Sequence, residues 1–153
     1  MCGINGFVQF ESMYHSEMLK SFVHQMNEQI VHRGPDSEGL FSDSHCALGM
    51  RRLSIIDFKG GDQPIWNETH DKMIVFNGEL YNYLSLREEL KQKGYVFSTD
   101  SDTEVVLHGF ESYGPSFLKR MEGMFAFAIY DLSAKTWTLA RDKIGEKPLY
   151  YYQ

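Results

Sequence analysis

The sequence contains few cysteines and no long hydrophobic run. Only two cysteines, Cys2 and Cys46, occur among its 153 residues, too few for a disulfide framework. No apolar stretch approaches the roughly 20 residues that a membrane-spanning helix needs, and no charged segment followed by an apolar stretch marks a secretion signal. We therefore expect a cytoplasmic protein without a membrane partner.

Positive charge is also scarce. The chain has 15 Lys and Arg residues against 21 Asp and Glu residues, a formal net charge of -6 at pH 7, and its basic residues form no run. A nucleic-acid-binding surface needs clustered positive charge, so we expect no nucleic-acid partner. A chain of this length forms one domain that buries roughly 70% of its unfolded surface, and small-molecule chemistry is the favoured class of function.

Several signatures of cofactor and metal sites are absent from the sequence. No Gly-x-x-x-x-Gly-Lys or Gly-x-Gly-x-x-Gly loop is present to hold a nucleotide phosphate, and no Gly-x-Ser-x-Gly turn presents a serine nucleophile. The six histidines show no His-Glu-x-x-His spacing, and no Cys-x-x-Cys pair occurs. We therefore expect neither a metal site nor a cofactor in this chain.

The chain does contain an alternation of short strands and helices. Period-two runs and turn residues predict strands at 3–10, 39–42, 46–56, 72–76, 124–130 and 136–140. Apolar residues at three- and four-residue spacing predict a helix over 15–30, with a core stripe of Leu19, Phe22, Val23, Met26 and Ile30. Further helices are expected over 80–93, capped by Gly94, and from Ser101 and Pro115. These elements indicate layers of helices and sheets.

Two polar motifs inside these elements each allow two interpretations. Asn77-Gly78 is typical of a tight hairpin turn, which is the favoured interpretation, but an amide beside an accessible backbone N–H also suits an oxyanion. Strand alternation sends Arg51 and Arg52 to opposite faces. Either both are solvated, which composition favours, or one enters a cleft and holds a carboxylate with its planar fork.

Titratable groups also stand at the ends of two elements. Asp102 lies within Ser101–Glu104, which has capping-box spacing, and its carboxylate either complements the helix dipole or faces the ammonium group of a ligand. Cys2 follows the initiator methionine directly. Removal of Met1 would leave a thiol and a free α-amine on one residue, which is a nucleophile beside its own base.

Several short motifs occur together in a fixed order. They are Met1-Cys2-Gly3-Ile4, Arg33-Gly34-Pro35-Asp36, Arg52-Leu53-Ser54-Ile55-Ile56-Asp57, Asn77-Gly78-Glu79-Leu80-Tyr81-Asn82, Ser101-Asp102-Thr103-Glu104, Gly123-Met124-Phe125-Ala126-Phe127-Ala128 and Arg141-Asp142-Lys143-Ile144-Gly145. In order and spacing they closely resemble the glutaminase domain of glutamine-dependent asparagine synthetases. The resemblance implies that residues 1–153 form one type-2 glutamine amidotransferase domain. The implied fold is that of the N-terminal-nucleophile hydrolases, an α+β, four-layer αββα sandwich with mostly antiparallel sheets.

The resemblance also implies a catalytic group. In the family the mature enzyme begins at the cysteine, here Cys2, which attacks the side-chain amide of glutamine and releases ammonia. The Asn77 side chain and the Gly78 N–H match the positions that form the oxyanion hole.

Further residues correspond to the family's substrate site. Arg52 resembles the residue that grips the α-carboxylate of glutamine. Glu79 and Asp102 match positions that bind its α-ammonium group, and the backbone around Ile55 and Ile56 matches the segment that lines the substrate.

The second half of these synthetases, which binds ATP with magnesium and aspartate, does not occur in the 153 residues. The resemblance therefore implies a synthetase domain as a partner, and a homodimer is a further expectation. Similar domains serve the amidation of a sugar acid or an antibiotic precursor, so the acceptor of the ammonia stays open. Two further interpretations of the chain are a non-catalytic glutamine sensor and a structural domain with an incidental thiol.

Overall fold

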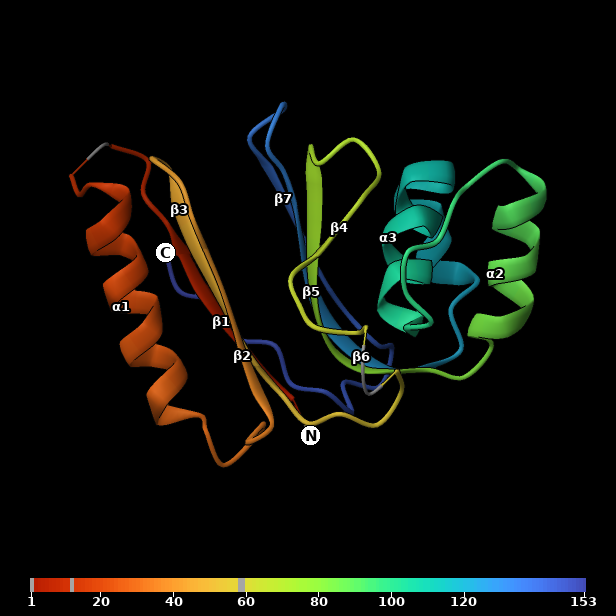
Figure 1. The fold of residues 1–153 in the computed structure, drawn as a ribbon, viewed down its shortest axis with the longest axis horizontal. Helices are drawn as coiled ribbons and strands as arrows, with labels where there is room; N and C mark the ends of the chain where they lie inside the picture. Colours follow the sequence, from red (N-terminus) through yellow and green to blue (C-terminus); the bar gives the residue numbers. More distant parts are fainter. Residues whose placement is uncertain (1, 12, 58–59) are drawn as a thin grey trace.

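A computed structural model describes residues 2–11, 13–57 and 60–153 of the chain, and these residues form four layers (Figure 1). The helices are α1 (Ser16–Gln29), α2 (Tyr83–Gln92) and α3 (Asp102–Tyr113), and α3 is followed by the short 3-10 helix η1 (Gly114–Lys119). The strands are β1 (Gly3–Val8), β2 (Ser37–Ser42), β3 (Cys46–Arg52), β4 (Ile65–Trp66), β5 (Lys72–Leu80), β6 (Gly123–Asp131) and β7 (Thr136–Arg141).

Two antiparallel sheets form the middle layers. The first sheet has the strand order β1-β3-β2, and the second has the order β4-β5-β6-β7. α1 covers the outer face of the first sheet, whereas α2 and α3 lie on the outer side of the second (Figure 1). This succession of layers confirms the expected α+β, four-layer αββα sandwich.

Adjacent layers share separate apolar cores. Leu19 and Val23 of α1 pack on Ala47 of β3. The core between the sheets consists of Cys46, Leu48, Met50, Met73, Val75, Ala128 and Tyr130. The core between the second sheet and its helices includes Phe76, Leu90, Val106, Phe117 and Phe127. Each sheet is therefore apolar on both faces, as expected for the middle layers of a sandwich.

Three strands end two or more residues away from the predicted position, and the first of them is β1, which ends at Val8 instead of Phe10. β3 ends at Arg52 instead of continuing to Ile56. β5 does not end at Phe76 but continues to Leu80, because Asn77 and Gly78 pair with Ala126 and Phe125 of β6. The interpretation of Asn77-Gly78 as a hairpin turn is therefore wrong, and the second helix begins at Tyr83 rather than at Leu80.

The predicted core stripe of α1 is only partly correct. Leu19 and Val23 are fully buried, but Phe22 and Met26 are 37% and 38% exposed. The third buried residue of this helix is Asn27, whose amide donates to the carbonyls of Gly39 and Met50 in the sheet beneath it. Residues 19, 23 and 27 are four apart, so a single line of side chains faces the narrow three-stranded sheet.

The predicted start of α3 is confirmed, but the hydrogen bonds at this end of the helix are not those of a capping box. Ser101 is the N-cap residue, and its hydroxyl accepts from the Thr103 N–H at 3.2 Å. The Glu104 carboxylate does not reach back to Ser101 but accepts from the backbone N–H groups of Ser98 and Thr99, each at 2.8 Å. Glu104 therefore fastens the segment that precedes the helix. The predicted Gly94 cap of α2 and the short helix predicted from Pro115 are confirmed, since Gly94 has φ 97° and Pro115 lies in the 3-10 helix η1.

Candidate active site

A cavity opens where the core between the two sheets ends. Its lining comes mainly from the residue before β1, the end of β3 and the segment that follows it, the end of β5 and the beginning of α3, with single residues from β6 and from the segment after β7. The lining contains all eight residues that the resemblance assigned to the site: Cys2, Arg52, Ile55, Ile56, Asn77, Gly78, Glu79 and Asp102. The fold thus brings together side chains that are far apart in the sequence.

Cys2 precedes β1 and packs against the core between the sheets. Its Sγ accepts from the Leu53 backbone N–H at 3.4 Å and lies 3.6 Å from the Leu53 carbonyl oxygen. Burial raises the pKa of the Cys2 thiol above its ordinary value, and the Leu53 N–H offsets only part of this effect. A thiol in this state is protonated at neutral pH, so it needs a base before it can act as a nucleophile.

Cys46 has a different environment. Cys46 is 0% exposed at the beginning of β3, and it does not line the cavity. Burial, with the Asp43 carboxylate beside it, raises the pKa of the Cys46 thiol to about 12. Of the two thiols, only Cys2 faces the cavity.

The alternation of β3 separates the two adjacent arginines. Leu48 and Met50 face the second sheet, so Arg52 continues this inner face and Arg51 points away from it. Arg52 is only 5% exposed and lines the cavity, whereas Arg51 donates through Nε to the Gly34 carbonyl at 3.0 Å. The interpretation of both arginines as solvated is therefore wrong.

Atoms of the loop after β3 fix the plane of the Arg52 guanidinium. Nη2 donates to the carbonyls of Ile56 and Asp57 at 3.0 and 2.5 Å, and Nη1 donates to Asp62 Oδ1 at 2.9 Å. Gly61 makes room for this arrangement, because a Cβ at that position would lie 2.5 Å from Nη2. The contact with Ile56 is made by its backbone, and the Ile55 side chain is 52% exposed at the rim.

β5 carries the next group of lining residues. Met73 and Val75 face the core between the sheets, so the same alternation directs Asn77 and Glu79 to the cavity at the end of that core. Asn77 is 6% exposed, whereas Glu79 is half-buried. An amide and a carboxylate therefore extend the apolar face of β5 into the cavity.

Gly78 lies between these two residues, where β5 and β6 approach closely. A Cβ added to Gly78 would lie 2.2 Å from the Met124 carbonyl oxygen and 2.7 Å from the Phe125 Cα. Only glycine fits this position without moving backbone. The backbone beside Asn77 is consequently not covered by a side chain of residue 78.

Asp102 is the first residue of α3 and is only 4% exposed. Its Oδ2 accepts from the Leu80 backbone N–H at 2.8 Å, which joins the beginning of α3 to the end of β5. Burial raises the pKa of Asp102, the Leu80 N–H opposes this shift, and the Glu79 carboxylate adds to it. Glu79 and Asp102 thus place two interacting carboxylates in the lining, at a site suited to a cation.

Sequence reasoning did not identify two further buried residues of the lining, Gln63 and Lys147. The Gln63 amide accepts from the Phe76 N–H at 2.6 Å and donates to the Phe76 carbonyl at 3.2 Å and to Thr103 Oγ1 at 3.3 Å. It therefore links β5 to α3 next to Asn77 and Asp102. Gln63 and Lys147 stand beside Pro64 and Pro148 in connecting segments, where no periodic pattern marks them.

The described part of the chain contains one cluster that could hold a metal ion. His24, Glu28 and Glu38 offer ligand atoms within 4.8 Å of one another, but all three are exposed and none lines the cavity. In the same part of the chain, no helix is long and apolar enough to cross a membrane.

Comparison with known proteins gives concordant results. The family model of the glutamine amidotransferase domain matches residues 1–153. Asparagine synthetase [glutamine-hydrolyzing] 1 of Bacillus subtilis strain 168 is 48% identical over 99% of this chain and 24% of its own length. Asparagine synthetase [glutamine-hydrolyzing] 2 of Arabidopsis thaliana is 41% identical over 98% of this chain and 25% of its own length. The chain thus spans about a quarter of the length of these curated relatives.

A solved structure supports the same relationship. Glutamine phosphoribosylpyrophosphate amidotransferase from B. subtilis, complexed with ADP and GMP, superposes with a TM-score of 0.53 at 26% identity. The match covers 66% of this chain and 24% of that one. From the match over its whole length, the chain belongs to the glutamine amidotransferase domain family.

Proposed function

We propose that this chain is a glutaminase domain that hydrolyses the side-chain amide of glutamine to glutamate and ammonia, with Cys2 as the nucleophile. One observation carries the proposal: a single cavity is lined by a thiol, an amide, a guanidinium and two carboxylates. A substrate with an amide at one end and an α-carboxylate and an α-ammonium group at the other matches these groups in chemistry and charge. Glutamine has all three.

The α-amine of Cys2 acts as the base after Met1 has been removed. The ordinary pKa of an α-amine is about 7.7–8.0, so a considerable fraction of the amine is neutral at about pH 7–8, and it lies on the same residue as the thiol whose proton it accepts. The thiolate attacks the amide carbon and forms a tetrahedral oxyanion. When this collapses, the proton passes to the leaving nitrogen, ammonia departs, and water hydrolyses the thioester on Cys2 to glutamate.

Asn77 and Gly78 stabilise the oxyanion in this proposal. The Asn77 amide and the Gly78 N–H donate to the negative oxygen, and one such donor is typically worth about 10² to 10³ in rate. Both residues belong to a strand that is paired with β6. The donors are therefore held in place before the substrate arrives, which is what electrostatic stabilisation of this kind requires.

The other end of glutamine is held by charged groups. Arg52 binds the α-carboxylate through its planar guanidinium, and Glu79 and Asp102 bind the α-ammonium group. Ile55 and Ile56 line the path between these groups. The support for these assignments is that all five residues share the lining with Cys2.

The ammonia is passed to a synthetase domain that forms asparagine. This part of the proposal is supported by the names of the relatives, which are glutamine-hydrolysing asparagine synthetases about four times as long as this chain. ATP, magnesium and aspartate would be bound by that domain and not by these 153 residues.

The proposal is tested by measuring glutamate and ammonia from glutamine at neutral pH, with Cys2→Ala as the blank. We expect equal amounts of both products from the native chain and none from the variant. Ammonia release that survives Cys2→Ala would contradict the proposal. Glutamine binding without turnover in the native chain would instead identify a glutamine sensor.

A further inference from the structure

We propose that Asp57 is a positioning residue that ties the Arg52 side of the cavity to the Asp102 side, an inference that rests on the proposed glutaminase function. Asp57 ends the Arg52–Asp57 motif, yet it does not line the cavity. Its main-chain and side-chain contacts reach both Arg52 and the segment before Asp102. It therefore acts on the substrate site through other residues.

The backbone of Asp57 has an uncommon conformation. Its φ is 51°, in the left-handed region that few non-glycine residues adopt, although Asp and Asn do so more readily than most. In this conformation its carbonyl accepts from Arg52 Nη2 at 2.5 Å. Residues held in such regions cluster at functional sites, where surrounding contacts stabilise them.

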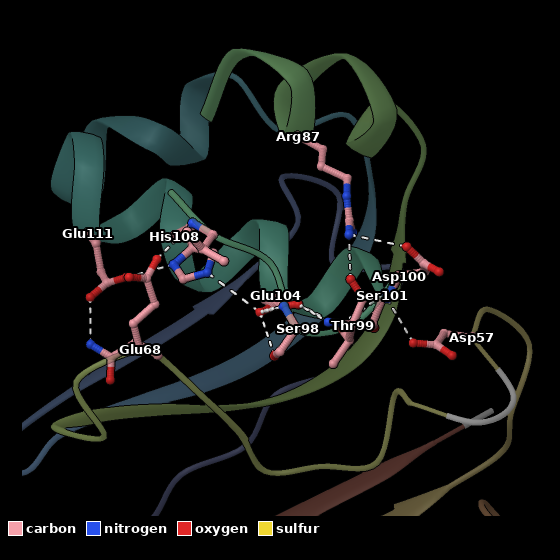
Figure 2. Close-up of polar contacts among 12 residues, drawn as sticks. Asp57, Glu68, Arg87, Ser98, Thr99, Asp100, Ser101, Glu104, His108 and Glu111 are labelled. Carbon is pink, nitrogen blue, oxygen red and sulfur yellow. Dashed lines mark hydrogen bonds and ion pairs between the residues drawn. The ribbon is translucent and has the colours of Figure 1, made fainter. Parts of the chain in front are cut away.

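The Asp57 carboxylate supplies such contacts from two directions. Oδ1 accepts from the Gly60 N–H at 2.8 Å, on the side of the cavity that carries Arg52. Oδ2 accepts from the Asp100 N–H at 2.9 Å, across to the segment that precedes α3 (Figure 2). Asp100 is two residues from Asp102. The Asp57 carboxylate therefore connects the segment that holds Arg52 with the beginning of α3, where Asp102 lies.

The segment around Asp100 is itself firmly held. Arg87 of α2 is 8% exposed, and its Nη2 donates to the Thr99 carbonyl at 2.5 Å and to Asp100 Oδ1 at 3.2 Å. Glu104, which is 2% exposed, accepts from the Thr99 N–H and from its hydroxyl at 2.8 and 2.6 Å. Figure 2 shows these contacts converging on the turn before α3. Asp57 therefore attaches the described residues that hold Arg52 to a fixed point.

The residues that Asp57 connects bind the α-groups of glutamine, and other residues carry out the reaction at its amide. The groups that hold the α-carboxylate and the α-ammonium group lie on the two sides that Asp57 connects. Asn77 and Gly78 belong to β5, and Cys2 directly precedes β1 and contacts Leu53, which directly follows β3. Loss of the Asp57 carboxylate should therefore weaken the binding of glutamine and leave the reactivity of Cys2 nearly unchanged.

The experiment uses covalent labelling of Cys2 by a diazo-ketone analogue of glutamine. The dependence of the labelling rate on analogue concentration gives a half-saturating concentration and a limiting rate. Asp57→Gly removes the carboxylate but accepts a φ of 51° freely, so we expect the half-saturating concentration to rise about tenfold, as the loss of charge-assisted hydrogen bonds predicts. The limiting rate should stay within about twofold of the native value. Asp57→Asn keeps one acceptor oxygen, so its half-saturating concentration should lie between those of the native chain and of Asp57→Gly.

Asp131→Ala is the matched control, because Asp131 also caps a turn, at Ala134, but lies outside the cavity. It should leave both labelling parameters unchanged. An unchanged half-saturating concentration in Asp57→Gly, or a fall in the limiting rate alone, would overturn the inference. The proposed function would still stand in that case, provided that the analogue labels Cys2 of the native chain. A native chain that is not labelled at Cys2 would overturn both.

Discussion

At the scale of single residues, the two adjacent arginines allow a direct test of the substrate site. Arg52→Lys should raise the KM for glutamine at least about tenfold, because an ammonium group cannot both bind the α-carboxylate and replace the planar guanidinium that Ile56, Asp57 and Asp62 hold in place. Arg51→Lys should change it by less than about twofold, since Arg51 bonds to the Gly34 carbonyl away from the cavity. Glutaminase kinetics of both variants decide the question. A larger effect for Arg51→Lys would show that the other face of β3 binds substrate.

The residues alone could not resolve which arginine enters the cavity. Alternation places Arg51 and Arg52 on opposite faces, but which face becomes a cleft depends on where the second sheet packs. Residues far from the motif fix that packing, such as Met73 and Val75 of β5. Only the resemblance selected Arg52, and the structure agrees on its place in the cavity.

Cys2 leads to a prediction about the N-terminus. Burial raises the pKa of its thiol, so the chain depends on a nearby base at neutral pH. We expect protein from which Met1 has been removed to be active and protein with additional N-terminal residues to be inactive, because an extended terminus has no free amine on Cys2. Intact mass and glutaminase activity should be measured on the same samples. Full activity in an extended sample would refute the role of the amine.

At the scale of elements, α3 contains a buried charged group that is separate from the cavity. His108 is 1% exposed, its Nδ1 lies 2.8 Å from Glu111 Oε2, and its Nε2 lies 3.6 Å from Glu104 Oε1. Burial alone would lower the pKa of His108, but the two carboxylates outweigh burial and raise it to about 9. Burial likewise opposes the interaction with His108 and the hydrogen bonds from Thr99 that lower the pKa of Glu104 to about 2.

This group predicts how stability depends on pH. The unfolded chain has a histidine pKa of about 6.5, so the folded state binds the proton of His108 more tightly. Its stabilisation is complete below pH 6.5 and is lost as the pH rises through about 9. The free energy of unfolding from urea titrations should fall over this interval, and His108→Gln should be less stable at pH 6 with a smaller fall. The exposed His32 provides the control variant His32→Gln. An equal fall in native protein and His108→Gln would exclude His108 as the cause.

The types of the main elements could be predicted from the sequence, but some boundaries and faces could not. Periodicity located α1, yet only Leu19, Val23 and Asn27 are buried there, because three strands offer too narrow a surface for the whole stripe. β5 continues through Asn77 and Gly78 because its pairing with β6 overrides the local preference for a turn. The two-residue strand β4 was missed, as so short an element has no detectable period.

At the scale of the whole molecule, the cavity is a consequence of stacking two sheets. The core between them is apolar along β3 and β5 and becomes polar where both strands end, with Arg52 on one and Asn77 on the other. Local patterns do not reveal how these ends align, because the alignment depends on contacts between residues far apart in the sequence. Motif order and spacing could identify the residues, whereas their convergence could be learned only from the fold.

The four-layer domain should carry out one half-reaction by itself. The chain should release ammonia from glutamine but form no asparagine when ATP and aspartate are added, because its sequence contains no recognised nucleotide-binding motif. It should also prefer glutamine to asparagine, which is shorter by one methylene, and such a difference is worth roughly 1–3 kcal/mol in kcat/KM. Product analysis with both amides, with and without ATP and aspartate, tests these expectations. Equal turnover of the two amides would mean that the cavity does not fix both ends of its substrate, and the assignment of Arg52 and Asp102 to the α-groups would then be wrong.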